Sequence, residues 1–335
     1  MINKFLSGVV FILTILAYSI FCVYLPIKSP HLFQEIEHKA DITVRPGMTA
    51  QEVVSAMKKT RLIECPYILL KQMRFLGIDK KLKPGVYTLR SGLEINVARQ
   101  LSSATPKDIK FMLVPGARYM ELSDAFDKSD GKGCFRKEIL DNSNFPAALA
   151  ALLPVRAEDR IAFLLPETYF LVPDRHQARQ FVRRAAALWF ERLMPNGVDP
   201  NKTDKSKLFK LAIIASIVEN EAKKAEERPI LAGIFIKRIE KFMPLQSCAT
   251  IVFCWREKGI DKRRLTYKDL QIDSPYNTYK NLGLPPGPIC APSESSWKST
   301  ITPEFTEYLF FFAADDGHHI FSKTYQEHIR KQKAN

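Results

Sequence analysis

The sequence contains little that would support a metal-bound or disulfide-bonded protein. Its six cysteines include no CxxC pair, and none lies at metal-ligand spacing from a histidine, which argues against a zinc site. Cys22 lies in an uncharged apolar run, so an odd number of cysteines remains outside it. An obligate disulfide framework is therefore not expected, not even between Cys248 and Cys254, the pair closest in sequence. We expect no metal and no cofactor.

Low-complexity segments are absent too, and the apolar (46%) and charged (26%) fractions are those of a folded protein. The net charge of +14 and the pI near 9.4 favour an acidic partner, which leaves nucleic acid, anionic lipid or an anionic wall polymer. The basic residues are scattered along the chain, so a generally basic soluble surface explains the charge equally well. Because no compact basic and aromatic motif is present, we expect no nucleic-acid partner.

One long stretch, residues 5–27, carries no charge. It is long enough to cross a bilayer as a helix. Its end, SIFCVYLP, is bulky where a cleavable signal peptide would have a small-x-small site, so we predict an uncleaved anchor. A single span after a short tail, residues 1–4, predicts a cytoplasmic N-terminus and an extracytoplasmic remainder.

The remainder mixes short strand and helix patterns, and we predict an α+β protein. We expect a small α+β subdomain over residues 38–105 and a larger mixed α+β domain over residues 106–335. In the first, a strand at 42–44 precedes Pro46-Gly47 and the capping box Thr49-x-x-Glu52. A second helix to about residue 76, a strand at 86–89 and a helix at 94–101 follow. The order strand, Pro-Gly, helix returns at residues 111–126, which is weak evidence for a repeat.

The larger domain has several readable segments. We predict a helical hairpin from residues 208–221 and 229–241, and a loop at 243–250 that leads into a strand-like apolar run. Rigid Gly/Pro-rich loops are expected at 274–279 and 283–289. The other predicted elements are a compact loop at 164–170, a helix at 176–194, a buried strand at 308–313 and a terminal helix at 324–333. His318 and His319 are expected in a turn, since further metal ligands are missing nearby.

The first helix of the hairpin has apolar residues on nearly all sides and should be buried. It ends at Glu219-Asn-Glu221. Partial desolvation and the negative end of the helix dipole both raise the pKa of a carboxyl there, as a general acid requires. The plain alternative is that both glutamates are solvated helix-end carboxylates.

The two glutamates cannot share one role, because two positions on a helix are about 200° apart. Glu219 falls in line with Ala212 and Ala215, whose small side chains leave room for a ligand. We therefore predict Glu219 as the general acid. Glu221 is expected to be a supporting residue paired with a base such as Arg228.

The loops that follow suit a carbohydrate ligand. Tyr276 and Tyr279 can stack on sugar rings, Asn277 can bind an N-acetyl group, and Gln246 can bond a hydroxyl or an amide. A structural loop with packed tyrosines explains the same residues equally well.

These segments together resemble one family, the endolytic murein transglycosylases (YceG-like proteins). The resemblance rests on motifs in the family's order and spacing, and covers nearly the whole chain beyond the predicted anchor. They are Ile214-Ala-Ser-Ile-Val-Glu-Asn-Glu-Ala222, Glu227-Arg-Pro-Ile-Leu-Ala-Gly-Ile-Phe-Ile-Lys-Arg238, Leu245-Gln246, Ser274-Pro-Tyr-Asn-Thr-Tyr279, Gly283-Leu-Pro-Pro-Gly-Pro-Ile289 and Ala291-Pro292. A weaker likeness marks residues 41–103 as the family's LysM-like subdomain.

The resemblance implies a single-pass inner-membrane lytic transglycosylase that cuts nascent peptidoglycan glycan strands and leaves 1,6-anhydro-N-acetylmuramic acid ends. It implies Glu219, the first of the Glu-x-Glu pair, as the catalytic acid. The attacking group is the sugar's own C6 hydroxyl, so the second carboxylate of an ordinary glycosidase is dispensable. Substrate contacts are implied for Thr278 and for the loop with Glu167 and Tyr169, and cell-wall synthases are implied as partners.

The sequence departs from the family pattern at two places. Ile161-Ala162 stands where the family usually has Glu-Gly, and Cys248 stands where it often has Asp. Both departures bear on substrate contact and rate. The competing hypothesis is therefore a membrane-anchored scaffold that binds peptidoglycan without cutting it.

Overall fold

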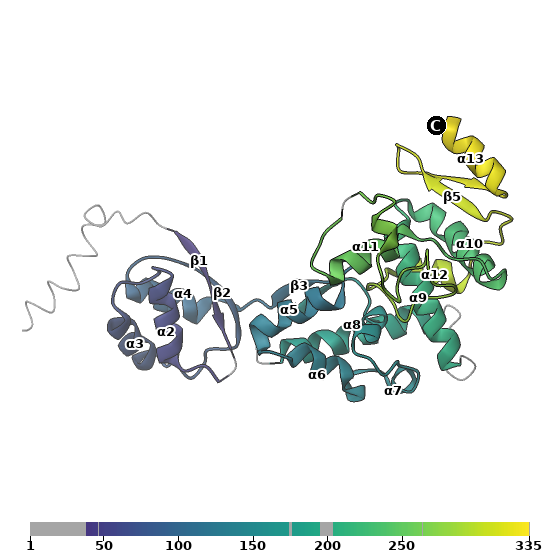
Figure 1. Ribbon diagram of the computed structural model, residues 1–335. Helices are drawn as coiled ribbons and strands as arrows, with labels where there is room; N and C mark the ends of the chain where they lie inside the picture. Colours follow the sequence, from purple (N-terminus) through teal and green to yellow (C-terminus); the bar gives the residue numbers. More distant parts are fainter. Residues whose placement is uncertain (1–37, 46, 174–175, 195–203, 263, 335) are drawn as a thin grey trace, which may run out of the picture. The chain divides into compact units, whose positions relative to one another are not determined.

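A computed structural model describes residues 38–45, 47–173, 176–194, 204–262 and 264–334 (Figure 1). The chain divides into two compact units, Met1–Lys107 and Asp108–Asn335. Each combines helices with two-stranded antiparallel sheets, so the predicted α+β class is confirmed. The predicted membrane helix at residues 5–27 and the tail before it lie outside the described residues. Within the described ranges, no helix is both long and apolar enough to span a bilayer.

The first unit is built on one antiparallel pair of strands. Its elements are β1 (Lys39–Val44), α2 (Ala50–Lys59), α3 (Pro66–Phe75), β2 (Gly85–Arg90) and α4 (Glu94–Ser103). The strands pair from Lys39 opposite Arg90 to Val44 opposite Gly85, and apolar side chains from all five elements form one core. The capping box is present, because the Thr49 backbone N–H donates to Glu52 Oε2 at 2.7 Å. The order of elements in this unit agrees with the sequence prediction.

The second unit is mostly helical and carries two small sheets. Its helices are α5 (Tyr119–Asp130), α6 (Cys134–Leu140), η2 (Asn142–Asn144), α7 (Ala147–Ala150), η3 (Glu158–Phe163), α8 (Gln177–Leu193), α9 (Lys205–Glu221), η5 (Ala225–Glu227), α10 (Arg228–Glu240), α11 (Cys248–Glu257), η6 (Asp269–Gln271), α12 (Glu294–Ile301) and α13 (Tyr325–Ala334). The strand pairs are β3 (Ile109–Met112) with β4 (Thr168–Leu171), and β5 (Phe310–Ala313) with β6 (His319–Ser322). Helices α9 and α10 pack together as the predicted hairpin, and α12 packs against both.

An aromatic cluster holds α8, α9 and α12 together. The ring centroids of Trp189 and Trp297 are 5.1 Å apart, and Phe163 lies 5.3 Å and 5.8 Å from them. Ala212 and Ala215 of α9 belong to the same buried core. Trp297 Nε1 donates to the Ala162 carbonyl at 3.0 Å, which satisfies the polar atom of a fully buried ring.

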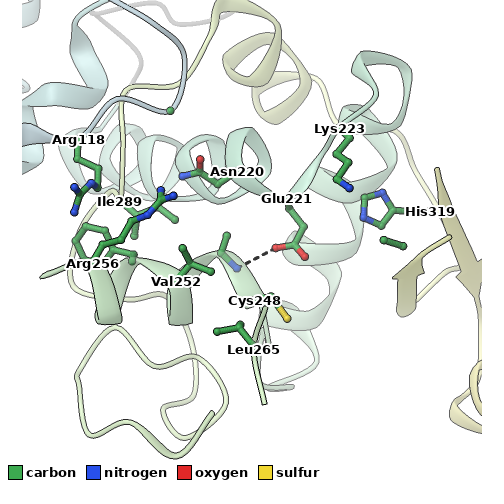
Figure 2. A pocket seen from close by; sticks show the side chains of 14 residues that line it. Arg118, Asn220, Glu221, Lys223, Cys248, Val252, Arg256, Leu265, Ile289 and His319 are labelled. Atoms are coloured by element: carbon green, nitrogen blue, oxygen red, sulfur yellow. Dashed lines mark hydrogen bonds between the residues drawn. The ribbon is translucent and has the colours of Figure 1, made fainter. Parts of the chain in front are cut away.

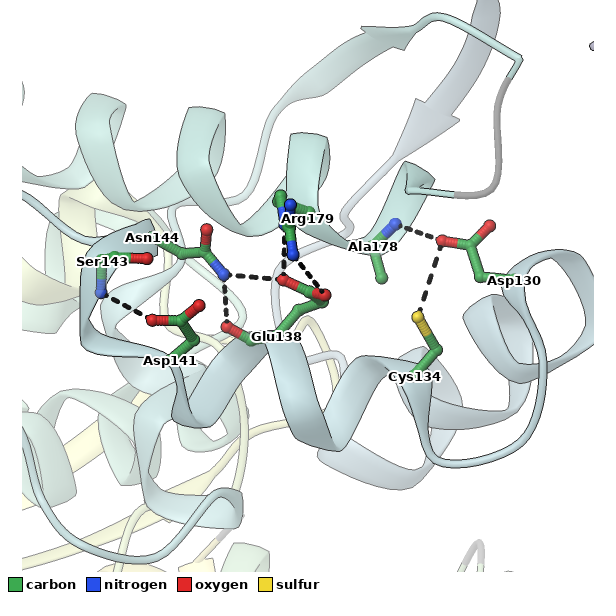
Figure 3. A network of polar contacts seen from close by, with 8 residues as sticks. All are labelled: Asp130, Cys134, Glu138, Asp141, Ser143, Asn144, Ala178 and Arg179. Carbon is green, nitrogen blue, oxygen red and sulfur yellow. Dashed lines mark hydrogen bonds and ion pairs between the residues drawn. The ribbon is translucent and has the colours of Figure 1, made fainter. Parts of the chain in front are cut away.

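A polar network joins α6 to α8 (Figure 3). Glu138 is only 2% exposed. Its Oε2 accepts from Arg179 Nε at 2.9 Å and from Asn144 Nδ2 at 2.9 Å. The buried carboxylate therefore has an ionic partner and a neutral donor, as a stable buried charge requires.

Three predicted elements differ from the structure. The apolar run after residue 248 is helix α11 instead of a strand; Ile251 and Cys254 are buried at helical spacing, and this packing overrides the β-propensity of its branched residues. The loop predicted at 164–170 ends in strand β4. The sequence did not predict this strand, because its pairing partner β3 lies far away in sequence. The strand at 308–313 exists as β5, but its side chains are half-buried or exposed.

Candidate active site

Helix α9 ends beside the candidate site and is as buried as its sequence predicts. Asp204 caps its start by accepting from the Ser206 N–H at 3.1 Å. An unbroken run from Ala212 to Val218 is buried. The last turn thus leads from the core directly to Glu219 and Glu221, which the helix directs to different sides.

Glu219 points into the protein, where α12 begins. Its Oε1 accepts from Arg228 Nη2 at 3.2 Å, and its Oε2 accepts from the Ser293 N–H and Ser296 Oγ, both at 2.8 Å. The side chain is 6% exposed. The predicted pairing of Glu221 with Arg228 is therefore wrong, because Arg228 binds Glu219. The room left by the small residues of α9 is filled by α12 with its Trp297, which belongs to the same core cluster as those alanines.

Glu221 instead lines a cavity of about 620 Å³ (Figure 2). Its Oε2 accepts from Ser247 Oγ at 2.6 Å and from the Ala249 N–H at 3.4 Å. These donors belong to the first residues and N-cap of α11, whose positive dipole end favours a carboxylate. Burial nevertheless outweighs these bonds and raises the pKa of Glu221. The geometry thus gives Glu221 the properties expected of a general acid.

The rest of the cavity wall is basic and apolar. Polar side chains come from the turn before α5, the end of α9 and the segment just after it, α11 and β6: Arg118, Asn220, Lys223, Cys248, Arg256 and His319. Gly116 lies in the Pro-Gly turn before Arg118 with a φ of 82°, and a Cβ there would meet Asn220 Oδ1 at 3.1 Å. Glycine at this position therefore permits both the turn and the close approach of α9.

A second hollow of about 250 Å³ adjoins the first, since both are lined by Arg118, Phe253 and Ile289. Tyr276 and Arg156 line only the second hollow. The two hollows together form a groove that extends beyond the surroundings of Glu221. The surface of this groove is rich in hydrogen-bond donors. An extended polar ligand suits such a groove.

The structure does not bring most of the predicted loop residues to the cavity. Asn277 is fully buried, and its Nδ2 donates to the Leu270 and Ile272 carbonyls at 2.9 and 2.7 Å. Thr278 Oγ1 accepts from the Ser247 N–H at 3.1 Å. These bonds shape the loop that supports Ser247, the donor to Glu221. The amide and the hydroxyl thus have internal partners where we predicted sugar contacts.

The other predicted contact residues are spread around the site. Tyr276 packs on Phe253 with ring centroids 4.8 Å apart and lines the second hollow. Tyr279 Oη lies 3.2 Å from Cys248 Sγ at the first hollow. Gln246 is exposed with a φ of 48°, an uncommon value for a non-glycine residue, and its N–H donates to the Thr278 carbonyl at 3.1 Å.

Glu167 and Tyr169 lie on or beside β4 and line neither hollow. Glu167 is exposed, and its Oε1 accepts from the Thr168 N–H at 2.9 Å. Tyr169 is 5% exposed, and its hydroxyl donates to the Leu165 carbonyl. Ile161 lines the second hollow, so this departure from the family pattern does lie beside the groove. Ala162 is fully buried and accepts the bond from Trp297.

Cys248 lines the cavity, and the reactivity of its thiol reports on the surroundings of that side chain. The residue as a whole is exposed, but atoms packed around its thiol, together with Glu221, raise the pKa of Cys248. Since the thiolate is the reactive form, we expect iodoacetamide to label Cys248 more slowly than free cysteine at about pH 8, with the rate still rising above about pH 9. Mass spectrometry of the labelled peptide measures this, with Cys248→Ala as the blank. Labelling as fast as free cysteine would contradict the geometry.

Sequence reasoning missed several cavity residues. Arg118, Lys223 and Arg256 lie on three segments whose meeting no local pattern predicts. His319 was expected to be only a turn residue, yet it begins β6 and lines the cavity. Within the described part of the chain, no group of three or more His, Cys, Asp or Glu side chains is arranged to hold a metal ion.

Comparisons with known proteins agree with one another. The profile of the YceG-like family matches residues 42–334. An endolytic murein transglycosylase of Bacillus subtilis (strain 168) is 29% identical over 309 residues, which covers 88% of this chain and 84% of that protein. One of Streptococcus pneumoniae serotype 2 is 30% identical over 274 residues, covering 78% of this chain and 47% of that protein. The chain therefore spans about half the length of the pneumococcal relative.

The fold also has a solved counterpart. The crystal structure of a yceG-like protein from Listeria monocytogenes superimposes with a TM-score of 0.53 at 24% identity, and covers 88% of this chain and 99% of that one. This likeness shows a shared fold. The family profile extends over almost all of the described residues, including both glutamates of α9 and the cavity-lining His319. The chain therefore belongs to the YceG-like family.

Proposed function

We propose that this protein is an endolytic murein transglycosylase and that Glu221 is its general acid. Relatives that bear this name match most of the chain. The observation that carries the residue assignment is that Glu221, with a raised pKa, lines the large cavity. Glu219 is instead enclosed by Arg228 and two serines. This assignment replaces our expectation from the sequence, in which Glu219 was the acid.

The reaction requires a protonated carboxyl beside the glycosidic oxygen. Glu221 would donate its proton to the oxygen that leaves C1 of N-acetylmuramic acid, while the C6 hydroxyl of the same sugar attacks C1 and gives up its proton to a base at the site. The product is a 1,6-anhydro end, and no water molecule is consumed. Because the nucleophile belongs to the substrate, the site needs no second carboxylate as a nucleophile or to activate water.

The groove suits a glycan strand that continues on both sides of the cut. Its two adjoining hollows offer Tyr276 and Phe253 as apolar surfaces. Arg118 and Arg256 supply donors at the first hollow. Arginine donors suit the acidic groups of peptidoglycan, which gives the +14 net charge a role. An endolytic enzyme needs such an open groove, since its substrate does not end at the site.

We further propose that residues 5–27 anchor the protein in the inner membrane with a cytoplasmic N-terminus. The uncharged length of this run supports the anchor. The catalytic unit would then face the extracytoplasmic glycan, and cell-wall synthases would be its neighbours because they act on the same glycan. The first unit, with two strands and three helices, would act as a LysM-like subdomain.

A product assay tests the activity. Purified full-length protein is incubated with uncrosslinked glycan strands, and the products are analysed by mass spectrometry. We expect muropeptides with anhydro ends from internal cuts. Products with only reducing ends would contradict the lytic mechanism, and glycan binding without any product would favour the scaffold hypothesis.

A further inference from the structure

A second titratable group beside Glu221 is held in a specific orientation. His319 lines the cavity, and its Nδ1 lies 2.7 Å from Glu227 Oε2. Its backbone N–H donates to Glu227 Oε1 at 2.8 Å. The two side chains are only 4% and 7% exposed. Both carboxylate oxygens of Glu227 are thus engaged by one residue.

This contact determines which ring nitrogen can accept a proton. An ionised carboxylate only accepts hydrogen bonds, so Nδ1 must carry the hydrogen and Nε2 must be the free acceptor of the neutral ring. No hydrogen bond to Nε2 is found in the described ranges. The rings of Phe311 and Phe321 lie 5.3 and 6.2 Å from the imidazole, which restricts its rotation. A carboxylate–imidazole pair of this kind is a common way to orient a general base.

The charged groups around the ring come from three elements. Glu221 ends α9 and Lys223 follows just after it, Glu227 lies in η5, and Arg238 lies in α10. Figure 2 shows His319 beside Glu221 and Lys223 at the cavity wall. Glu221 interacts electrostatically with both His319 and Arg238. An acid and a base therefore meet at one cavity.

We propose that His319, oriented by Glu227, is the base that removes the proton from the C6 hydroxyl of the muramic acid residue. The inference rests on the proposed transglycosylase function and divides its proton transfers between two residues. Glu221 would act only as the acid, where a single-carboxylate mechanism would use it twice.

The step balances in atoms and charge. The C1–O bond to the leaving sugar breaks, and its oxygen takes the proton of Glu221. The C6 oxygen bonds to C1, and its proton passes to His319 Nε2. The site is left with a carboxylate and an imidazolium, and return of one proton from His319 to Glu221 restores both.

The test uses the full-length enzyme and a variant that keeps the contact to Glu227. His319→Asn retains an amide donor near the position of Nδ1 but has no basic nitrogen at the position of Nε2. We expect its rate of anhydro-end formation to fall about 10²-fold with little change in the melting temperature. His318→Asn is the matched control, because the neighbouring His318 is half-exposed and contacts Asp316 in the turn. It should keep the wild-type rate.

The pH profile separates a base from a structural residue. A base must be neutral and an acid must be protonated, so the wild-type rate should rise and then fall with increasing pH. His319→Asn should lose the rise on the acid side and keep the fall. If His319→Asn unfolds, Glu227→Gln serves instead. The glutamine amide can donate a hydrogen bond to Nδ1, which places the ring hydrogen on Nε2. This variant should therefore also lose the rise in rate on the acid side.

Three outcomes would overturn the inference. The first is a rate of His319→Asn close to that of the wild type. The second is a reduced rate of His319→Asn with the rise on the acid side of the pH profile intact, which would mark His319 as structural. Either of these two results affects only the role of His319, provided that the wild type forms anhydro ends and Glu221→Gln does not. The third outcome is that the wild type forms no anhydro ends; the proposed function then fails, and this inference fails with it.

Discussion

Glu221→Gln is expected to lower anhydro-end formation on the order of 10³-fold or more, because the amide has no proton to give to the leaving oxygen. The side chain keeps its size, and its amide oxygen can still accept from Ser247 and Ala249. The variant should therefore fold and bind glycan. Mass spectrometry of the digested strands measures the loss, and a melting curve confirms the fold.

Glu219→Gln is the matched control, two residues away on the same helix. It weakens the contact to Arg228 and should lower the melting temperature. Since Glu219 does not line the cavity, the variant should keep the greater part of the wild-type rate. If Glu219→Gln were inactive and Glu221→Gln active, the role predicted from the sequence would be restored to Glu219 and the geometric assignment would be wrong.

The second large effect is on stability. Arg228→Met should lower the free energy of unfolding by about 3–5 kcal/mol, because it leaves the buried charge of Glu219 without an ionic partner. The guanidinium is 15% exposed and the carboxylate 6%, so water can replace little of the lost contact. Urea unfolding followed by circular dichroism measures the change.

The double variant Glu219→Gln with Arg228→Met checks the cause. Removing both charges leaves no unpaired ion, so the double variant should be more stable than Arg228→Met alone. Losses that simply add would show that the two residues act independently. A loss below about 1 kcal/mol in Arg228→Met would mean that the pair behaves like an exposed one.

Local patterns in the sequence were sufficient for much of the fold. The capping box at Thr49 and Glu52 and the apolar run of α9 predicted these helices, because caps and burial periodicity act over a few residues. They failed at α11, where a β-branched run is helical because Ile251 and Cys254 pack inward. Pairing of β4 with β3 was also missed, since strand partners can be distant in sequence.

The sequence by itself determined that a buried helix ends in two carboxylates on opposite faces, and its motifs indicated the family. Only the tertiary structure decided which carboxylate meets the cavity. Small residues beside Glu219 looked like room for a ligand, yet α12 packs there and supplies serines to that carboxylate. The same holds for His319, whose partner Glu227 is remote in sequence. What fills the space beside a helix face depends on segments far along the chain, and no local pattern encodes their approach.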